Sequence, residues 1–204
     1  MGDARYRIPL EAHRIEQEVE RSRFVTTLGL AETPEMARQF VDQCRRAMPD
    51  ASHHCWAFVA GPPGATAQIG QSDDGEPHGT AGRPMLAALL HSDVGEIVAV
   101  VTRYFGGVLL GKGGLVRAYT GGVVTALETL PTKLRVALAT RVLVFDYAHI
   151  TGFKRLLAGH EAEVLGEDFG ADVTVTVRLP VSQREGFERA VTDLTHGAVL
   201  IGDP

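Results

Sequence analysis

The segment 97–127 constrains the fold of this chain more than any other part of its sequence. Residues from Ile97 to Phe105 form a nearly continuous apolar run, which is typical of a buried strand. Five glycines follow between 106 and 114, and small and apolar residues then recur at helical spacing from Leu115 to Leu127. The segment therefore predicts a strand, a glycine-rich turn and a helix that packs closely on a sheet.

Further strands and helices are predicted before this unit. At Thr33-Pro34-Glu35 a capping hydroxyl precedes a proline and an acid, which indicates the start of a helix that ends before Pro49. The other expected elements are strands over 11–20, 24–30 and 55–60, a long loop over 61–79, and a helix after it that Thr80 caps.

The segment after Pro131 has the element order βαββαβ, which is that of a ferredoxin-like domain. A capping box at 182–185 is expected to start its second helix. We therefore expect an α+β protein of two domains, 1–131 and 132–204. The expected C-terminal elements are strands over 134–147, 163–167, 172–179 and 198–201, and helices over 149–158 and from 182.

The charge distribution bounds the kind of partner. The net charge of −5 argues against tight, sequence-independent binding to duplex nucleic acid, because neutralisation of phosphate drives such binding. However, no Asp or Glu lies between 97 and 127, where Arg103, Lys112 and Arg117 do lie. This stretch is a local surplus of positive charge in an acidic protein.

The sequence also bears on the compartment. No apolar run approaches the roughly 18 residues that a membrane span needs, and residues 1–9 lack the apolar core of a secretory signal. The two cysteines, Cys44 and Cys55, have no paired spacing that indicates a zinc site or a disulfide framework. We therefore expect a soluble, cytoplasmic protein that has no membrane partner.

The glycine-rich turn is a candidate anion site. Backbone N–H groups at the start of a helix are unpaired, Gly113 and Gly114 let a ligand approach them, and Lys112 adds a full positive charge. Alternatively, the glycines only serve a tight turn and the lysine is merely solvated. Gly106, Gly111 and Lys112 also nearly match a phosphate-binding P-loop, but Gly113 replaces the hydroxyl residue that holds Mg²⁺.

An acidic cluster precedes this turn. Asp73, Asp74 and Glu76 repel one another unless a cation shares their site. The cluster is either a solvated loop or a fold-back in which the acids pair with an arginine or hold Mg²⁺, and its length and glycine content favour pairing. The candidate arginines are Arg83, Arg103 and Arg117.

The strand that starts at His53 carries a possible nucleophile. Alternation places His53 and Cys55 on one face, opposite His54 and Trp56. A Cys–His nucleophile needs the ring to reach the thiol, whereas side chains two apart on a strand point in parallel. We therefore expect a structural or ligand-facing His53 rather than a catalytic pair.

These motifs resemble those of the YigZ/IMPACT family. The stretches SDDGEPHGTAGRPML at 72–86 and VVTRYFGGVLLGKGGLVRAY at 100–119 look like its two signatures, and ASHHCWAF at 51–58 and Ser22-Arg23-Phe24 also fit. The resemblance implies an N-terminal two-layer α/β sandwich like that of a ribosomal protein and a domain of elongation factor G. It also implies a ferredoxin-like C-terminal domain and a link to translational control.

The leading hypothesis is a non-enzymatic regulatory protein that associates with RNA or the ribosome. Arg103, Lys112 and Arg117 would contact phosphate, and Tyr104 or Phe105 would stack on bases. No catalytic residue and no resident cofactor is expected. The alternatives are an enzyme that acts on a phosphate-bearing small molecule with the loop carboxylates and Mg²⁺, and a protein-interaction module. The remaining candidate positions are Gly106, Gly107, Gly111, Gly113 and Gly114 in the turn, and His53, Asp73, Asp74, Glu76, Thr80 and Arg83 as its supporting loop.

Overall fold

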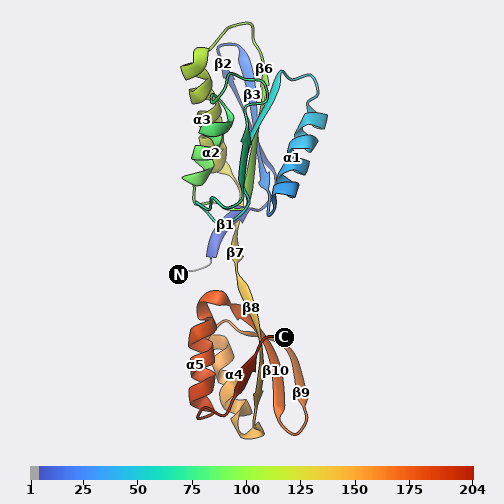
Figure 1. Ribbon diagram of the computed structural model, residues 1–204, viewed down its shortest axis with the longest axis vertical. Coiled ribbons are helices and arrows are strands. Elements are labelled where there is room, and N and C mark those ends of the chain that lie inside the picture. Colours follow the sequence, from blue (N-terminus) through green and yellow to red (C-terminus); the bar gives the residue numbers. More distant parts are fainter. Residues whose placement is uncertain (1–4) are drawn as a thin grey trace. The chain divides into compact units, whose positions relative to one another are not determined.

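The computed structural model describes residues 5–204, which fall into two compact units (Figure 1). The first is Tyr6–Leu134, and the second is Arg135–Pro204 together with Arg5. Across 5–204, no helix has the length and apolar character needed to cross a membrane. The mixed α+β class is confirmed. The boundary between 131 and 132, as a limit of independent folding, stays a prediction.

The first unit is built on a five-stranded sheet in the order β2-β3-β6-β4-β5, in which all neighbours are antiparallel. The central strand β6 has seven of its eight residues buried, as its apolar run predicted. The strands are β2 (His13–Val19), β3 (Ser22–Leu30), β4 (His53–Val59), β5 (Ile69–Ser72) and β6 (Ile97–Tyr104).

Strand β5 corrects the expectation of one long loop over 61–79. Its four residues pair with β4, and Gly70 lies so close to the ring of Phe58 that a Cβ atom would collide with it. The strand is short and carries little apolar material, which is why its sequence reads as a loop.

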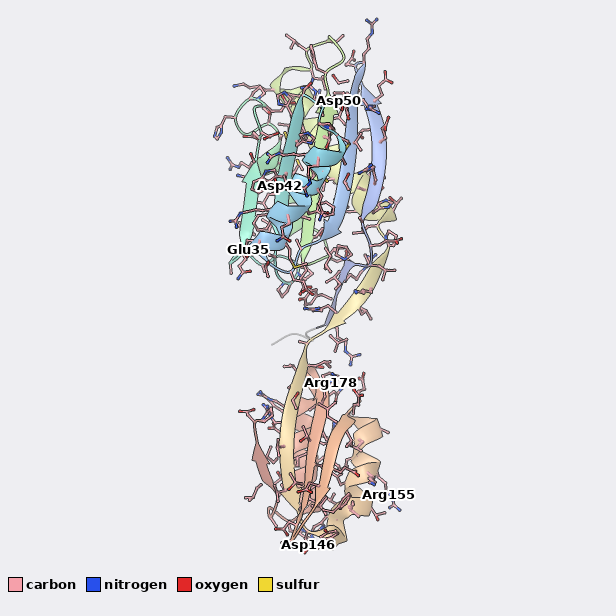
Figure 2. All side chains as sticks on the ribbon, turned by 90° about the vertical axis from the view of Figure 1, so that its right-hand side faces the viewer. Glu35, Asp42, Asp50, Asp146, Arg155 and Arg178 are labelled. Carbon is pink, nitrogen blue, oxygen red and sulfur yellow. The ribbon has the colours of Figure 1, made fainter. Side chains whose placement is uncertain are left out.

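Helices cover both faces of this sheet. Helix α1 (Pro34–Ala47) packs on one face, and α2 (Gly82–Leu90) and α3 (Gly111–Thr129) pack on the other. Figure 2 shows α1 in front of the sheet, with Glu35 and Asp42 labelled. This adds a third layer to the two that we expected, because β6 is apolar on both faces and both must be covered.

The start of α1 is as predicted, but the start of α3 is not. The hydroxyl of Thr33 accepts a hydrogen bond from the N–H of Met36 at 3.2 Å, which is the expected cap. Helix α3 begins at Gly111 rather than at Leu115. The turn before the helix uses Gly107 and Gly111, which both have positive φ. Because the helix starts at Gly111, Lys112 lies in its first turn.

The single strand expected over 134–147 is two strands. Strand β7 (Thr132–Val136) pairs with β1 (Arg5–Pro9), which was not predicted, whereas β8 (Leu138–Phe145) pairs with β10 and β11. The chain therefore changes pairing partners at Ala137.

The second unit has the ferredoxin-like strand order β11-β8-β10-β9, fully antiparallel. Alternate residues of β10, from Val173 to Leu179, are wholly buried, as their alternation predicted. The capping box at 182–185 is wrong, because Ser182 lies in a 3₁₀ turn and α5 starts without a side-chain cap. The remaining elements are α4 (Ile150–Gly159), β9 (Glu163–Phe169), β10 (Val173–Pro180), α5 (Arg184–Leu194) and β11 (Leu200–Gly202).

Candidate functional site

The loop between β5 and α2 folds back onto the first unit, and each of its three carboxylates has donors there. Asp73 caps α2: Oδ1 accepts from the N–H groups of Ala81 and Gly82 at 3.0 and 2.9 Å, and Oδ2 accepts from that of Gly79 at 2.7 Å. Burial raises the pKa of the Asp73 carboxyl, but these three donors outweigh it and hold the pKa below its ordinary value.

Thr80 is therefore not the cap that we expected. Its hydroxyl donates to the carbonyl of Pro77 at 2.6 Å, so it stabilises the loop and not the helix start. The carboxylate of Asp73, which lies eight residues before the N-cap position Ala81, takes the capping role instead, and spacing along the sequence does not indicate this.

Asp74 ties the loop to α1 and β4. Its Oδ1 accepts from Nη2 of Arg45 at 2.8 Å, and its Oδ2 accepts from the N–H of His54 at 2.7 Å. Pairing of the acids is thus found, but Arg45 was not among the candidate partners. Arg83 and Arg117, which were, are exposed and form no ion pair within residues 5–204.

Glu76 forms a buried ion pair. Its Oε1 accepts from Nη1 of Arg103 at 2.7 Å and from the hydroxyl of Tyr119 at 2.8 Å. Nη2 of Arg103 donates to the hydroxyl of Ser22 at 3.3 Å. Since Arg103 is 5% exposed and Glu76 is 8% exposed, the structure places Arg103 inside the unit, where its charge is neutralised.

The two aromatic candidates lie on different sides. Tyr104 faces α1, where the guanidinium of Arg23 lies 4.0 Å from its ring centre and its hydroxyl donates to Asp50 at 3.4 Å. Phe105 is 49% exposed, and the guanidinium of Arg103 lies 5.5 Å from its ring centre. Only Phe105 therefore presents a ring on the side of the α3 start.

His53 and Cys55 share a face, as predicted, but have separate partners. Nδ1 of His53 bonds to the carbonyl of Asp74 at 2.8 Å, and the thiol of Cys55 donates to the carbonyl of Asp73 at 2.9 Å. Burial raises the pKa of Cys55 to about 12. The thiol is thus a structural group, and His53 is not arranged to activate it.

Most glycines of the turn are explained by packing or by backbone conformation. Gly106 lies against the backbone of Arg21 and Ser22, where a Cβ atom would collide, and the positive φ of Gly107 and Gly111 favours glycine. Gly114 lies in the first turn of α3 against Leu110, whereas Gly113 faces open space apart from Arg117. Of these glycines, only Gly113 has no steric reason to be glycine.

A cleft of about 470 Å³ opens between the acidic loop, the end of β6 and the start of α3. Lys112 and Phe105 stand at its rim, and His53, Glu76 and Arg103 lie at its inner end. The first turn of α3 has no acidic residue and no side-chain cap. The cleft therefore joins a positively polarised helix start to a buried polar cluster.

Two other predicted positions lie outside this cleft. Arg117 lines a separate cleft of about 470 Å³ with residues of the β2–β3 turn. Arg83 lies at a larger, mainly apolar groove of about 950 Å³ between α2 and α3. The structure thus brings together His53, Glu76, Arg103, Phe105, Gly111 and Lys112, and leaves Arg83, Tyr104 and Arg117 apart.

The three loop carboxylates, which we considered as holders of Mg²⁺, are not grouped around one point. Within the described part of the chain, no three His, Cys, Asp or Glu side chains are grouped to hold a metal. Asp73, Asp74 and Glu76 turn toward different donors instead of converging.

Sequence reasoning missed three partners of the loop acids and of Arg103. Ser22 and Tyr119 are buried, whereas Arg45 is partly exposed. In the sequence, Tyr119 reads as part of the buried face of a helix, and nothing there identifies Glu76 as the partner of its hydroxyl. The one available hint was its polar atom on an otherwise apolar face, because such an atom needs a buried partner.

Comparison with known proteins gives two family matches. The Impact N-terminal domain matches residues 20–127, and a domain of unknown function, DUF1949, matches residues 143–198. The chain is 44% identical to the IMPACT family member YigZ of Escherichia coli K12 over 95% of both proteins. It is 42% identical to an IMPACT family member of Haemophilus influenzae over 97% of this chain and 96% of that protein. A crystal structure of a hypothetical protein matches with 42% identity and a TM-score of 0.69, over 98% of both chains.

Proposed function

The chain belongs to the IMPACT family, and from that premise we propose that it is a non-enzymatic regulatory protein that associates with RNA or the ribosome. It acts in the cytoplasm and in translational control. Membership of the family supports a general role that its members share. The site described above supports RNA or the ribosome as the partner.

The main observation behind this proposal is the start of α3. Its first N–H groups have no acceptor within the helix, no side chain of residues 5–204 caps them, and no acid lies in the first turn. Lys112 projects beside them and is exposed. A phosphate oxygen satisfies these donors, and the helix dipole favours its negative charge.

The phosphate-contacting set is smaller than the sequence indicated. Arg103 has its charge taken up by Glu76, so it supports the site from within rather than binding phosphate. Lys112 and Arg117 remain as exposed cations, and Phe105 is the ring available for stacking. A small contact set suits moderate, salt-sensitive binding to a single strand or a ribosomal surface better than a tight grip on a duplex.

A binding role also agrees with the state of the cysteine next to the site. Cys55 is buried and its pKa is raised by burial to about 12, so its thiolate is scarce at neutral pH. Cys55 is therefore poorly suited to act as a thiol nucleophile.

Binding measured against salt tests the proposal. Ribosomes and single-stranded RNA are titrated with the parent protein and with Lys112→Ala, Arg117→Ala and Arg46→Ala. Arg46 is the matched control, since it is an exposed cation on α1 that belongs to neither cleft. Lys112→Ala and Arg117→Ala should each weaken binding and lower the salt slope by up to about one unit. Equal binding by all four proteins, or inhibition by mononucleotides but not by polyanions, would overturn the proposal.

A further inference from the structure

Two hydrogen-bond acceptors lie side by side at the inner end of the cleft. Glu76 accepts both of its hydrogen bonds through Oε1, and within residues 5–204 no donor bonds to Oε2, although the side chain is only 3% exposed. Oε2 is not itself closed off from solvent, so either water or a ligand donates to it. Glu76 lines the cleft, so a donor group of a ligand there can replace water at Oε2.

The second acceptor is the ring of His53. Its Nδ1 lies 2.8 Å from the carbonyl oxygen of Asp74, which can only accept, so Nδ1 carries the hydrogen. In the tautomer that carries its hydrogen on Nδ1, Nε2 is an acceptor, and it lies 4.0 Å from Oε1 of Glu76. His53 also lines the cleft, so its floor offers two neighbouring acceptors.

We propose that this cleft takes one unpaired guanine of an RNA strand, an inference that rests on the proposed function. Among the four bases, only guanine carries two adjacent donors, N1–H and N2–H, on its Watson–Crick edge. Adenine and cytosine place an acceptor next to their amino group, and uracil has one N–H between two carbonyls. The pair of acceptors on Glu76 and His53 therefore complements guanine and leaves a mismatch with each of the other three.

The rest of the cleft fits the other parts of a nucleotide. Phe105 has one side toward the guanidinium of Arg103 and is 49% exposed, so a base can stack on its open side. Lys112 and the first turn of α3 lie at the rim, where the phosphate of the same nucleotide can bind. The volume of about 470 Å³ lies within the usual range of small-molecule sites.

Replacement of a single base tests the inference without altering the protein. Binding of uridine oligomers with one central guanine, hypoxanthine or adenine is followed by fluorescence anisotropy. Hypoxanthine keeps N1–H but lacks the amino group, so it should bind about tenfold more weakly than guanine, because one buried hydrogen bond is lost. Adenine should bind more weakly still.

Variants then locate the selectivity. Lys112→Ala should weaken all three oligomers by the same factor and keep the preference for guanine. Glu76→Gln should reduce that preference. If this variant does not fold, Phe105→Ala is used instead; Phe105 lies on the exposed rim, and its loss should weaken binding of all three oligomers. Affinities within twofold for the three oligomers overturn the inference and leave the proposed function standing. Absence of binding to every oligomer and to ribosomes overturns both.

Discussion

Nη1 of Arg103 lies 2.7 Å from Oε1 of Glu76, in a place where neither side chain is more than 6% exposed. The pair joins the end of β6 to the acidic loop, and the hydroxyl of Tyr119 attaches α3 to the same oxygen. These three elements are the walls of the cleft. The ion pair therefore sets the shape of the candidate site, and its loss should affect stability and binding together.

Removal of Glu76 should be strongly destabilising. Glu76→Ala leaves the guanidinium of Arg103 buried without a counter-charge, which costs about 3–5 kcal/mol. Glu35→Ala is the matched control, since it removes an exposed ion pair with Arg38 and should cost less than about 1 kcal/mol. Urea unfolding of both variants measures the difference. Equal losses for the two variants would show that the buried pair does not hold the fold.

Asp74→Asn tests the fold-back of the loop onto α1. The charge-assisted bonds to Arg45 and to the N–H of His54 are weakened, so the free energy of unfolding should fall by more than about 0.5 kcal/mol. Asparagine tolerates the positive φ of 41° at this position, so the backbone is not strained by the change. Asp42→Asn, which alters only an exposed contact with the same arginine, is the control. Melting of Asp74→Asn that matches the parent would contradict the prediction.

Asp73→Ala should lower stability at pH 7 by about 0.5–2 kcal/mol, which is the usual value of a helix cap. The pKa of Asp73 is lower in the folded chain than in the unfolded one, where it is about 3.9. Its contribution is therefore complete above that value and is lost as the pH falls through the lower, folded pKa. The difference in stability between parent and variant should be constant from pH 7 to 5 and shrink below about pH 4. A difference that persists unchanged in acid would mean that the charge of Asp73 is not involved.

Both cysteines should resist alkylation in the native protein. Burial raises the pKa of Cys55 to about 12 and also raises that of Cys44, so neither thiol is ionised or accessible at pH 8. Iodoacetamide followed by mass spectrometry should give modification of both thiols in urea and of neither in buffer. Rapid native modification of Cys55 would return the nucleophile alternative to consideration.

The sequence predicts the parts of this protein that depend on local pattern. The cap at Thr33, the buried strand over β6 and the alternation along β10 are all set by residues within a few positions of one another. Short-range sterics and hydrogen bonding decide such features, so they are readable without knowledge of the fold. The resemblance of the two signature stretches to the IMPACT family is likewise confirmed, by the match over 20–127 and by a relative that is 44% identical over 95% of the chain.

The contacts that build the candidate site are not readable in this way. Glu76 meets Arg103 across 27 residues and Tyr119 across 43 residues, and any of several arginines could have paired with the acids. Which one does so depends on the register of β4 against β6, which places His53 opposite Arg103 next to the loop. A side-chain contact at such a separation follows from the tertiary fold and not from spacing.

Limited proteolysis should release a stable fragment near 132–204. The second unit has a core of its own around Leu143, Phe153 and Phe187, separate from the two clusters that flank the five-stranded sheet. A segment with its own core and a complete βαββαβ order can fold alone. A protease of broad specificity at low concentration, followed by mass spectrometry and circular dichroism of the fragment, tests this. Cleavage confined to 61–79, with the two parts never separating, would contradict a boundary near Pro131 and indicate that the units unfold as one.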